Sequence, residues 1–370
     1  MIKRDQIPLS LYVHFPWCER KCPYCDFNSH ELKGDIDEDQ YIDLLLQDLS
    51  IDVAHFSETR PLKSIFMGGG TPSLFSGDSI AKLIEGIGTQ IKIAKDTEVT
   101  LEANPGSSEA SKFAAFRRAG VNRLSLGIQS FSNSSLKLIG RIHSGAQSHQ
   151  AVQSLLNAGF DNFNLDLMFG LPKQTVAQAI EDVQHALNYH PTHMSCYQLT
   201  FEPNTLFYHQ RPKRINDDGL WEMQQSVQQL LNTQGYEHYE VSAYNRGGRP
   251  SLHNLNYWTY GDYIGIGAGA HSKITSLDGT INRLWKRKNP RQYQRAPADG
   301  FTGGAETITP KDALFEALLN GLRLKQGVTL EQVEARSGCT IAQLPALDAL
   351  VKEGLLELDH TTLRTSESGF

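Results

Sequence analysis

The sequence predicts an α/β protein whose larger part is a partial (β/α)6 barrel of the TIM type, followed by a small C-terminal α+β domain of winged-helix character. Short β-rich runs alternate with stretches of helical period from residue 10 to about residue 240. The β-rich runs are mostly apolar, which is typical of a parallel sheet covered by helices. The last 60 residues or so contain three helical stretches and a hairpin. A doubly wound sheet would use the same units; the barrel predicts functional groups at the C-terminal ends of the strands.

The predicted strands of the barrel are short runs rich in β-branched, aromatic and aliphatic residues. They are Ser10–Phe15, Ser64–Met67, Glu98–Glu102, Arg123–Gln129, Asn162–Phe169 and His193–Thr200. The clearest helix is Glu38–Phe56, where apolar residues recur every three or four positions and form one stripe. The other helices of the alternation are Asp78–Ile93, Ser108–Ala119, Gly145–Ala158 and Val176–Tyr189.

The rest of the chain is divided between an extension of the barrel and the C-terminal domain. We expect a barrel core over residues 1–240, an extension over 241–300 and a C-terminal domain over 301–370. Residues 292–310 are rich in Pro, Gly and Ala and predict a linker. The remaining expected elements are a loop over Phe201–Arg214, a helix over Asp217–Gln234, a strand over Tyr236–Ser242, helices over Lys311–Leu324, from a Thr329/Gln332 cap and over Ile341–Glu353, and a hairpin of Leu355–Leu358 with Thr361–Arg364.

Composition and charge exclude several classes of protein. The chain of 370 residues has a net charge of −6, and residues 310–370 carry six basic and nine acidic side chains. Phosphate contacts need a basic face, so we expect no nucleic-acid partner. The chain shows no signal-peptide pattern and no apolar run of about 18 residues, which predicts a cytoplasmic protein. Five cysteines, three of them clustered, suit a reducing compartment; Cys196 and Cys339 are expected to be small buried apolar residues.

Three cysteines follow the first predicted strand directly. Cys18, Cys22 and Cys25 have the spacing C-x3-C-x2-C. Three thiolates hold a four-iron cluster and leave one iron without a protein ligand, so that a small chelating molecule can bind there. Two alternatives remain. Cys22 and Cys25 alone form a C-x-x-C redox pair, which would not need Cys18, and a zinc site could take His14 or His30 as its fourth ligand.

Polar or glycine residues occur at four successive strand ends. Gly68–Pro72 follows the second strand, and three glycines let the backbone pass close to a ligand. Glu102 ends the third strand, where its carboxylate could accept hydrogen bonds from ribose hydroxyls. Gln129, with Arg141 twelve residues later, ends the fourth strand, and Asp166 lies on the fifth. Singly such residues are surface or capping groups, but together they predict a ligand site.

The stretch Leu252–Trp258 contains His253, Tyr257 and Trp258. An imidazole nitrogen is a suitable axial ligand for haem iron, and two aromatic rings offer flat apolar faces for a macrocycle. The alternative is a capped turn in which His253 bonds to the backbone and both aromatic residues belong to the core.

The cysteine spacing resembles that of the radical S-adenosylmethionine (SAM) superfamily. Over essentially the whole chain, further segments resemble its coproporphyrinogen-dehydrogenase-like branch: Tyr12–Cys18, Gly68–Thr71, Glu102–Pro105, Gly127–Phe131, Asp166–Thr175 and Gly265–Ser272. The resemblance implies a [4Fe-4S] cluster on Cys18, Cys22 and Cys25, with SAM chelating the open iron. It also implies a set of SAM-binding residues: Tyr12, Tyr24, Gly69, Gly70, Thr71, Glu102, Gln129, Arg141, Asp166 and His271.

Two departures bear on the choice of function within this branch. Genuine coproporphyrinogen dehydrogenases carry C-x3-C-x2-C-x-C after a longer leading segment, whereas here the fourth position is Phe27 and Tyr12 is near the start. The motif around His253 instead resembles the haem-contact motif of the haem-chaperone members. The resemblance implies a haem chaperone without dehydrogenase activity, with His253 as haem ligand. Its expected partners are haem, haem-accepting respiratory apoproteins and an electron donor to the cluster, with peripheral membrane contact compatible with this role. An oxygen-independent coproporphyrinogen III dehydrogenase, acting by radical SAM oxidative decarboxylation, is the alternative.

Overall fold

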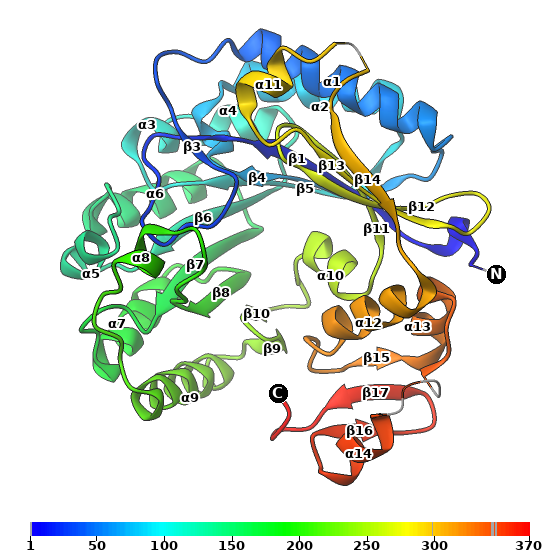
Figure 1. Cartoon of the computed structure of the whole chain (residues 1–370). Coiled ribbons are helices and arrows are strands. Elements are labelled where there is room, and N and C mark those ends of the chain that lie inside the picture. Colours follow the sequence, from blue (N-terminus) through cyan, green and yellow to red (C-terminus); the bar gives the residue numbers. More distant parts are fainter. Residues whose placement is uncertain (1, 298, 342–343, 345) are drawn as a thin grey trace.

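The computed structural model describes residues 2–297, 299–341, 344 and 346–370 (Figure 1). Within these residues, a sheet of twelve strands forms the larger part of the molecule, in the order β14-β13-β12-β11-β1-β4-β5-β6-β7-β8-β10-β9, where β10 is Ala243–Asn245. Six of its strands are parallel neighbours and carry the predicted alternation: β1 (Leu9–Phe15), β4 (Leu62–Gly69), β5 (Ile93–Ala103), β6 (Arg123–Gln129), β7 (Phe163–Phe169) and β8 (His193–Gln198). The predicted α/β class, with its mostly parallel sheet, is confirmed.

The helices that connect these strands lie along the outer, convex side of the curved sheet (Figure 1). Neighbouring helices contact each other, as α1 does α2 and α7 does α9. This arrangement is that of a partial barrel, because a doubly wound sheet would place helices on both faces. The helices of this layer are α1 (Glu38–His55), α2 (Gly77–Gln90), α3 (Ser107–Ala110), α4 (Phe113–Arg118), α5 (Asn133–Leu138), α6 (Gly145–Asn157), α7 (Val176–Leu187) and α9 (Asp217–Thr233). No helix in the described ranges has both the length and the apolar character needed to cross a membrane.

Strand β1 is buried along almost its whole length. Leu9, Leu11, Val13 and Phe15 are fully buried and belong to the main core cluster with residues of α1. β1 pairs in parallel with β4 on one side and with β11 (Asp262–Ile266) on the other. A strand flanked on both edges and packed on both faces has little freedom to shift, so its C-terminal end is a well-defined position for the loop that follows.

The predicted helix over residues 108–119 is divided into α3 and α4. Between them, Lys112 N hydrogen-bonds to Glu109 O, three residues back instead of four. The buried Glu109 carboxylate accepts hydrogen bonds from Ser73 Oγ and Asn104 N, whereas Phe113 is buried in the main core. Because the helix is broken here, the Glu109 carboxylate and the Phe113 ring can face different parts of the structure.

The prediction of a linker over residues 292–310 is wrong. Thr302–Thr307 forms β14, the outermost strand of the large sheet, and pairs antiparallel with β13 (Ile281–Lys286). β14 is mostly exposed and lacks apolar alternation, and any side chain at Gly304 would collide with the ring of Trp285. The glycines in this region therefore belong to an edge strand, where the absence of a side chain at Gly304 leaves room for the Trp285 ring. Two more elements of this region are β12 (His271–Thr275) and α11 (Pro290–Gln294).

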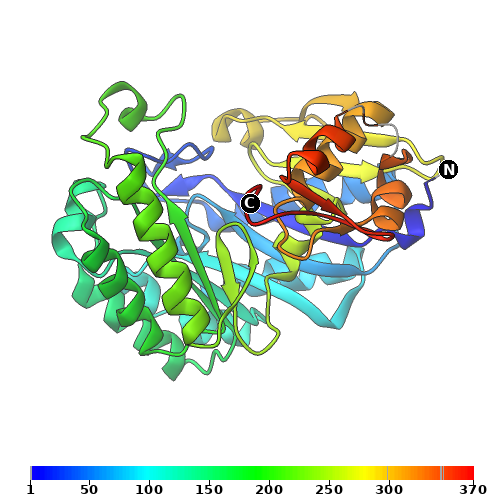
Figure 2. The same cartoon turned by 90° about the horizontal axis from the view of Figure 1, so that it is seen from below.

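The C-terminal domain lies between the two edges of the large sheet (Figures 1 and 2). Glu316 of α12 (Pro310–Gly321) pairs with Arg283 of β13 at 2.8 Å, and Arg323 pairs with Glu240, the last residue of β9 (Glu237–Glu240), at 3.1 Å. Its other elements are α13 (Leu330–Ser337), α14 (Leu347–Lys352) and a sheet of β15 (Val328–Thr329), β17 (Thr362–Thr365) and β16 (Leu356–Leu358). Residues 342, 343 and 345 of the predicted helix Ile341–Glu353 lie outside the described residues. The division at residues 240 and 300 stays a prediction.

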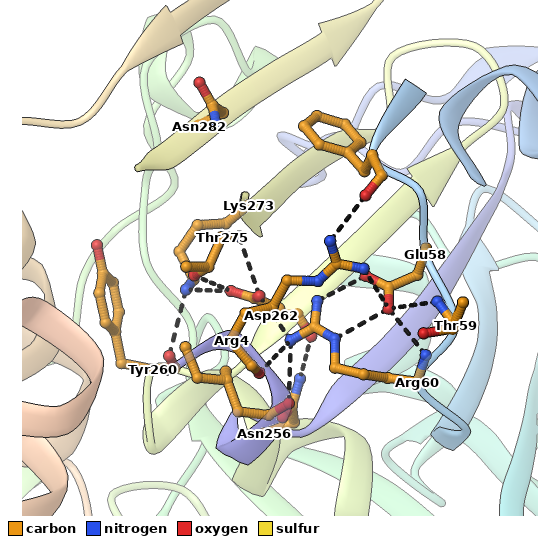
Figure 3. Close-up of polar contacts among 12 residues, drawn as sticks. Arg4, Glu58, Thr59, Arg60, Asn256, Tyr260, Asp262, Lys273, Thr275 and Asn282 are labelled. Atoms are coloured by element: carbon orange, nitrogen blue, oxygen red, sulfur yellow. Dashed lines mark hydrogen bonds and ion pairs between the residues drawn. The ribbon is translucent and has the colours of Figure 1, made fainter. Parts of the chain in front are cut away.

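A buried network of charges joins the N-terminus to the start of β11 (Figure 3). Asp262 accepts hydrogen bonds from Arg60 Nη1 and Lys273 Nζ, both at 2.9 Å. Glu58 pairs with Arg60 at 2.7 Å and with Arg4 at 3.0 Å. All five side chains are buried, so each charge depends on its partners for solvation.

The same network positions the short helix that precedes β11. Asn256 lies on α10 (Leu252–Trp258) and its amide donates to Asp262 O at 2.8 Å, while Thr275 donates to the Asp262 carboxylate through its backbone N–H and its hydroxyl. Burial opposes ionisation of Asp262, but Lys273 and Arg60 outweigh it and hold the pKa of this carboxyl below its ordinary value. The carboxylate thus links α10, β11 and β12.

We expect Asp262→Ala to lower the free energy of unfolding by roughly 3–5 kcal/mol, because it leaves Arg60 and Lys273 buried without their partner. Urea unfolding followed by circular dichroism measures the change. Since the folded pKa of Asp262 is depressed, its contribution is present above the ordinary aspartate pKa and is lost as pH falls through the folded value. The variant should therefore lose less stability than the wild type between pH 5 and pH 3. Asp39→Ala, at the exposed pair with Lys82, is the control and should change little; an equally small effect at Asp262 would contradict this role.

Candidate cofactor and ligand site

The loop after β1 places the three clustered cysteines at the C-terminal end of the barrel strands. Cys18, Cys22 and Cys25 line one cavity of about 390 Å³. Two short strands within the loop, β2 (Trp17–Cys18) and β3 (His30–Glu31), pair with each other. The loop also continues the contact with β4, since Trp17 O accepts from Thr71 N at 2.7 Å.

The ends of five consecutive strands contribute the rest of this cavity, as the barrel geometry allows. Eight of the ten residues that the family resemblance implied for SAM line it together with the cysteines: Tyr24, Gly69, Gly70, Thr71, Glu102, Gln129, Arg141 and Asp166. Sequence reasoning missed Asn104, Ser125 and Tyr197, which line the same cavity. Asn104 lies two residues beyond a predicted strand end, which is a signal that could have found it, whereas Ser125 and Tyr197 lie within strands and carry no such signal.

Glycines 69 and 70 are needed for a close approach of two backbone segments. Gly69 has a φ of +102°, in the region that favours glycine, and a Cβ there would collide with the His14 ring. A Cβ at Gly70 would meet the carbonyl oxygens of Phe15 and Trp17. The strand end of β4 thus packs directly under the cysteine loop and leaves its backbone open to the cavity.

Glu102 is a buried carboxyl at the end of β5. Burial raises its pKa, the neighbouring Asp166 raises it further, and the Gly69 N–H, which donates to Oε2 at 3.2 Å, opposes both, so that the pKa is about 8. The carboxyl is therefore mainly protonated at neutral pH without a ligand. Hydroxyl donors from a bound ribose would favour the ionised form.

Arg141 reaches the cavity from the turn that follows α5. Its Nη1 donates to Cys22 Sγ at 3.6 Å, and its Nη2 donates to Asn104 Oδ1 at 2.7 Å and to Gly127 O at 2.8 Å. The guanidinium therefore lies against the sulfur of Cys22 and is held there by two oxygen acceptors of the cavity wall. The turn itself packs on the cysteine loop, because a Cβ at Gly140 would meet Pro23.

Gln129 is held in an unusual backbone conformation at the end of β6. Its φ is +67°, and the pairing of β6 with β7 shifts register at this position. Its side-chain oxygen accepts a hydrogen bond from Tyr197 Oη at 2.6 Å. Asp166 on β7 accepts from Ser125 and Asn164. These contacts fix two polar groups on the cavity wall.

A second cavity, of about 700 Å³, adjoins the first and contains His253. Phe27, Ser29, Gly69 and Glu102 line both cavities. Tyr12 and His271, the remaining two residues implied for SAM, line the second cavity and not the first. Its aromatic wall consists of Tyr12, Phe66, Tyr257 and Tyr263.

His253 lies on α10 and is 1% exposed. Its Nδ1 is 2.9 Å from Ser64 Oγ, while its Nε2 has no hydrogen-bond partner among the described residues. Burial lowers the pKa of the imidazole to about 3, so the ring is neutral. With the proton on Nδ1 and donated to Ser64, Nε2 keeps a free lone pair. The alternative of a histidine bonded to the backbone is not what the ring contacts show.

The two aromatic residues after His253 point in different directions. The Tyr257 ring packs edge-on against the His253 ring, with ring centroids 4.8 Å apart, and lines the cavity. Trp258 instead packs against the core of the C-terminal domain, where the Arg323 guanidinium lies 4.2 Å from its ring centroid. One of the two expected flat faces is therefore available to a ligand beside His253.

The zinc alternative needs the three thiols and a histidine close enough to share one metal ion. No group of three His, Cys, Asp or Glu side chains within the described residues is placed to hold a single metal ion. Both ring nitrogens of His14 are already engaged, by Tyr12 Oη at 2.9 Å and Asn28 O at 3.0 Å. Nε2 of His30, the other histidine considered as a zinc ligand, has no hydrogen-bond partner among the described residues.

Comparison with known proteins gives two family matches. The model described as the radical SAM superfamily matches residues 12–186, and the model described as the HemN C-terminal domain matches residues 308–370. "Heme chaperone HemW" of Escherichia coli is 45% identical over 350 residues, covering 94% of this chain and 92% of that protein. The protein of the same name from Haemophilus influenzae is 47% identical, covering 90% and 86%, and that of Lactococcus lactis is 32% identical, covering 99% and 95%. The solved coproporphyrinogen III oxidase (HemN) of Escherichia coli matches with a TM-score of 0.82 at 23% identity, covering 99% of this chain and 88% of that one, which shows a shared fold.

We expect the Glu102 carboxyl to be protonated at pH 7 and to ionise as pH rises through about 8, because burial and Asp166 both disfavour its charge. Infrared difference spectra between pH 6 and pH 10 measure the loss of the protonated carboxyl band. Glu102→Gln removes this band and is the control for assignment. If the measured pKa of Glu102 were that of an ordinary glutamate, burial and Asp166 would not raise it as described.

Proposed function

The chain belongs to the HemW-type branch of the radical SAM superfamily, and on this premise we propose that it is a haem chaperone that binds haem and delivers it to haem-requiring respiratory proteins. Relatives named heme chaperone HemW match it over 86–95% of their own length. The proposal places the protein in the cytoplasm, with an electron donor for its cluster, haem-accepting apoproteins and peripheral membrane contact.

A [4Fe-4S] cluster and SAM are part of this proposal. Cys18, Cys22 and Cys25 would hold the cluster, and their fit is supported by three thiols on one cavity wall and by the Arg141 contact to Cys22. When bound, the cluster supplies single electrons and an open iron that the methionine end of SAM can chelate. Residues of this chain would orient SAM: the backbone at Gly69 and Gly70 would meet its amino group.

The remaining wall residues have distinct proposed tasks toward SAM. Glu102 would accept hydrogen bonds from the ribose and lose its proton in doing so. Gln129, Arg141 and Asp166 would contact the nucleoside, each held by the hydrogen bonds described above. The half-buried Arg141 also places a positive charge on this cavity wall.

The observation that carries haem binding is the unpartnered Nε2 of His253 beside a cavity of about 700 Å³. A buried polar atom without a partner is costly, and an iron porphyrin would provide one. The neutral state of the ring supports ligation, because a protonated imidazole cannot bind iron. Rings of Tyr12, Phe66 and Tyr257 would contact the macrocycle.

Coproporphyrinogen dehydrogenation, by radical SAM oxidative decarboxylation, is the alternative for this fold. Its resemblance pattern requires a cysteine two positions after Cys25, where this chain has Phe27, which is 58% exposed and lines both cavities. A phenylalanine offers a ring to a ligand but no thiolate to a metal. We therefore propose that this activity is absent.

Anaerobic reconstitution with iron and sulfide should give about four iron atoms per chain, because three thiolates suffice for a cubane. Cys22→Ala should abolish the cluster signal in electron paramagnetic resonance of the reduced protein. Cys196→Ala is the matched control, since this buried cysteine lies on β8 within the main core, and the variant should retain the cluster. Equal loss in both variants, or full iron content in Cys22→Ala, would contradict the assignment.

The proposed function is tested by titrating the reconstituted protein with haem and then measuring transfer to a haem-depleted respiratory enzyme. We expect His253→Ala to weaken haem binding by about tenfold or more and to change the haem absorption bands, because the axial nitrogen is lost. His149→Ala is the control, since this histidine bonds to Tyr189 and lines neither cavity.

The same preparations are assayed with coproporphyrinogen III, SAM and a reductant. No turnover is expected. Decarboxylation of coproporphyrinogen III without haem transfer would overturn the chaperone proposal, and unchanged haem spectra in His253→Ala would refute the ligand but leave haem binding standing.

A further inference from the structure

The cavity that contains His253 changes character from its buried end to its rim. Toward the interior it is lined by aromatic rings and by the buried imidazole. At the rim it is lined by exposed or half-exposed polar side chains, namely Lys21, Asp26, Asn28, His30, Asn204, His271 and Lys288. An apolar interior with a polar, cationic rim suits an amphiphilic ligand, whose apolar body enters and whose charged groups stay outside.

We propose that Lys288 and Lys21, with His271, bind the carboxylate groups of the tetrapyrrole that enters this cavity. This inference rests on the proposed function, since haem is a flat apolar macrocycle with two propionate side chains. The carboxylates would stay at the rim, which would orient the macrocycle so that its centre lies toward His253. The rim thereby specifies which edge of the ligand enters first.

Lys288 is an exposed lysine in the segment that follows β13. Asn28 of the cysteine loop donates to Lys288 O and to Ala268 O, both at 2.9 Å, and so ties the segment after β13 to the cluster loop. The Lys288 ammonium makes no hydrogen bond or ion pair with any residue in the described part of the chain. An exposed cation whose backbone carbonyl is held by Asn28, and whose ammonium has no partner among the described residues, is available to a ligand.

Lys286, two residues earlier, is also a lysine but is not available to a ligand. The Lys286 side chain is 1% exposed and pairs with Asp48 at 2.6 Å and Asp52 at 2.8 Å. All its charge is neutralised inside the fold. Lys288 lies past the end of the strand and lines the cavity instead.

Lys21 and His271 complete the rim around Lys288. Lys21 Nζ donates to Phe27 O at 2.9 Å and Ser29 O at 3.1 Å, which uses two of its three N–H groups and fixes the ammonium in place. His271 is close enough to Lys288 for the two to interact electrostatically. Burial, and then Lys288, lower its pKa, so the ring is a neutral hydrogen-bond donor.

The charges at the rim favour an anion with two carboxylates. Among the described residues that line this cavity, Asp26 is the exposed acidic side chain, against the two lysines. The other acid, Glu102, is buried and mainly protonated without a ligand. Two ammonium groups facing one carboxylate leave the rim positive, and charge-assisted hydrogen bonds to propionates would satisfy the excess.

The test compares haem with its dimethyl ester, which keeps the iron macrocycle but has no free carboxylates. Both are titrated into the reconstituted wild-type protein, Lys288→Glu, Lys288→Arg and Lys92→Ala. Lys92 is an exposed lysine that lines neither cavity and is the matched control. We expect Lys288→Glu to bind haem about tenfold more weakly than the wild type and to bind the ester unchanged, because only the carboxylate contact is lost.

Salt and the conservative variant sharpen the result. Wild-type affinity for haem should fall between low and high salt, whereas affinity for the ester should not, since rim charges are screened. Lys288→Arg should retain haem binding. The wild-type comparison of haem with its ester needs no variant and so does not depend on variant folding.

The outcomes separate this inference from the function on which it rests. If the wild type binds haem and its ester equally at low salt, and Lys288→Glu matches Lys92→Ala, the rim assignment is overturned while haem binding stands. If the wild type binds neither compound, the proposed function fails, and the rim assignment fails with it. A haem-specific loss in Lys288→Glu with normal ester binding supports the inference.

Discussion

The parallel pairing of β1 with β4 on one side and β11 on the other is the constraint on which the rest of the structure depends. Both edges of β1 are hydrogen-bonded and its core residues are fully buried. The pairing continues past the strand, because Phe15 O accepts from Gly70 N and Trp17 O from Thr71 N, both at 2.7 Å. A loop that carries three cysteines would be mobile by itself. Here its first residues are held as an extension of the sheet, so Cys18 begins from a fixed point above the strand ends.

The same pairing explains why two cavities meet at one wall. β1 and β4 send Tyr12, Phe66 and Gly69 to the inner side of the barrel, and α10 covers that side with His253. Gly69 and Glu102 then lie between the cysteine cavity and the histidine cavity, and both line each of them. A ligand in either cavity changes the solvation of the shared carboxyl, whose pKa is already displaced by burial.

The C-terminal domain supports this arrangement from outside. Ion pairs connect it to both edges of the open sheet, Glu316 with Arg283 and Arg323 with Glu240. Trp258 at the end of α10 packs into its core, so the helix that carries His253 is held between the barrel and this domain. The buried Asp262 network fixes the other end of the connection. The C-terminal domain thus has a structural task, which is to hold α10 against the barrel.

The sequence by itself determined the α/β alternation, the strand ends and the cysteine loop, because these depend on local period and spacing. Burial on both faces of the parallel strands produces apolar runs that are visible along the chain, and a C-x3-C-x2-C loop keeps its cysteines within eight residues. Only the tertiary structure decided which distant groups meet. Ser64 engages one nitrogen of His253 and leaves the other free, Trp258 turns away from the ligand cavity, and Tyr12 and His271 lie beside His253 instead of in the cysteine cavity. The glycine strand β14 escaped detection because its pairing with β13 and its cover by Trp285 come from segments outside its own sequence. Contacts between residues far apart in the chain depend on how the sheet closes, and local patterns carry no record of that closure.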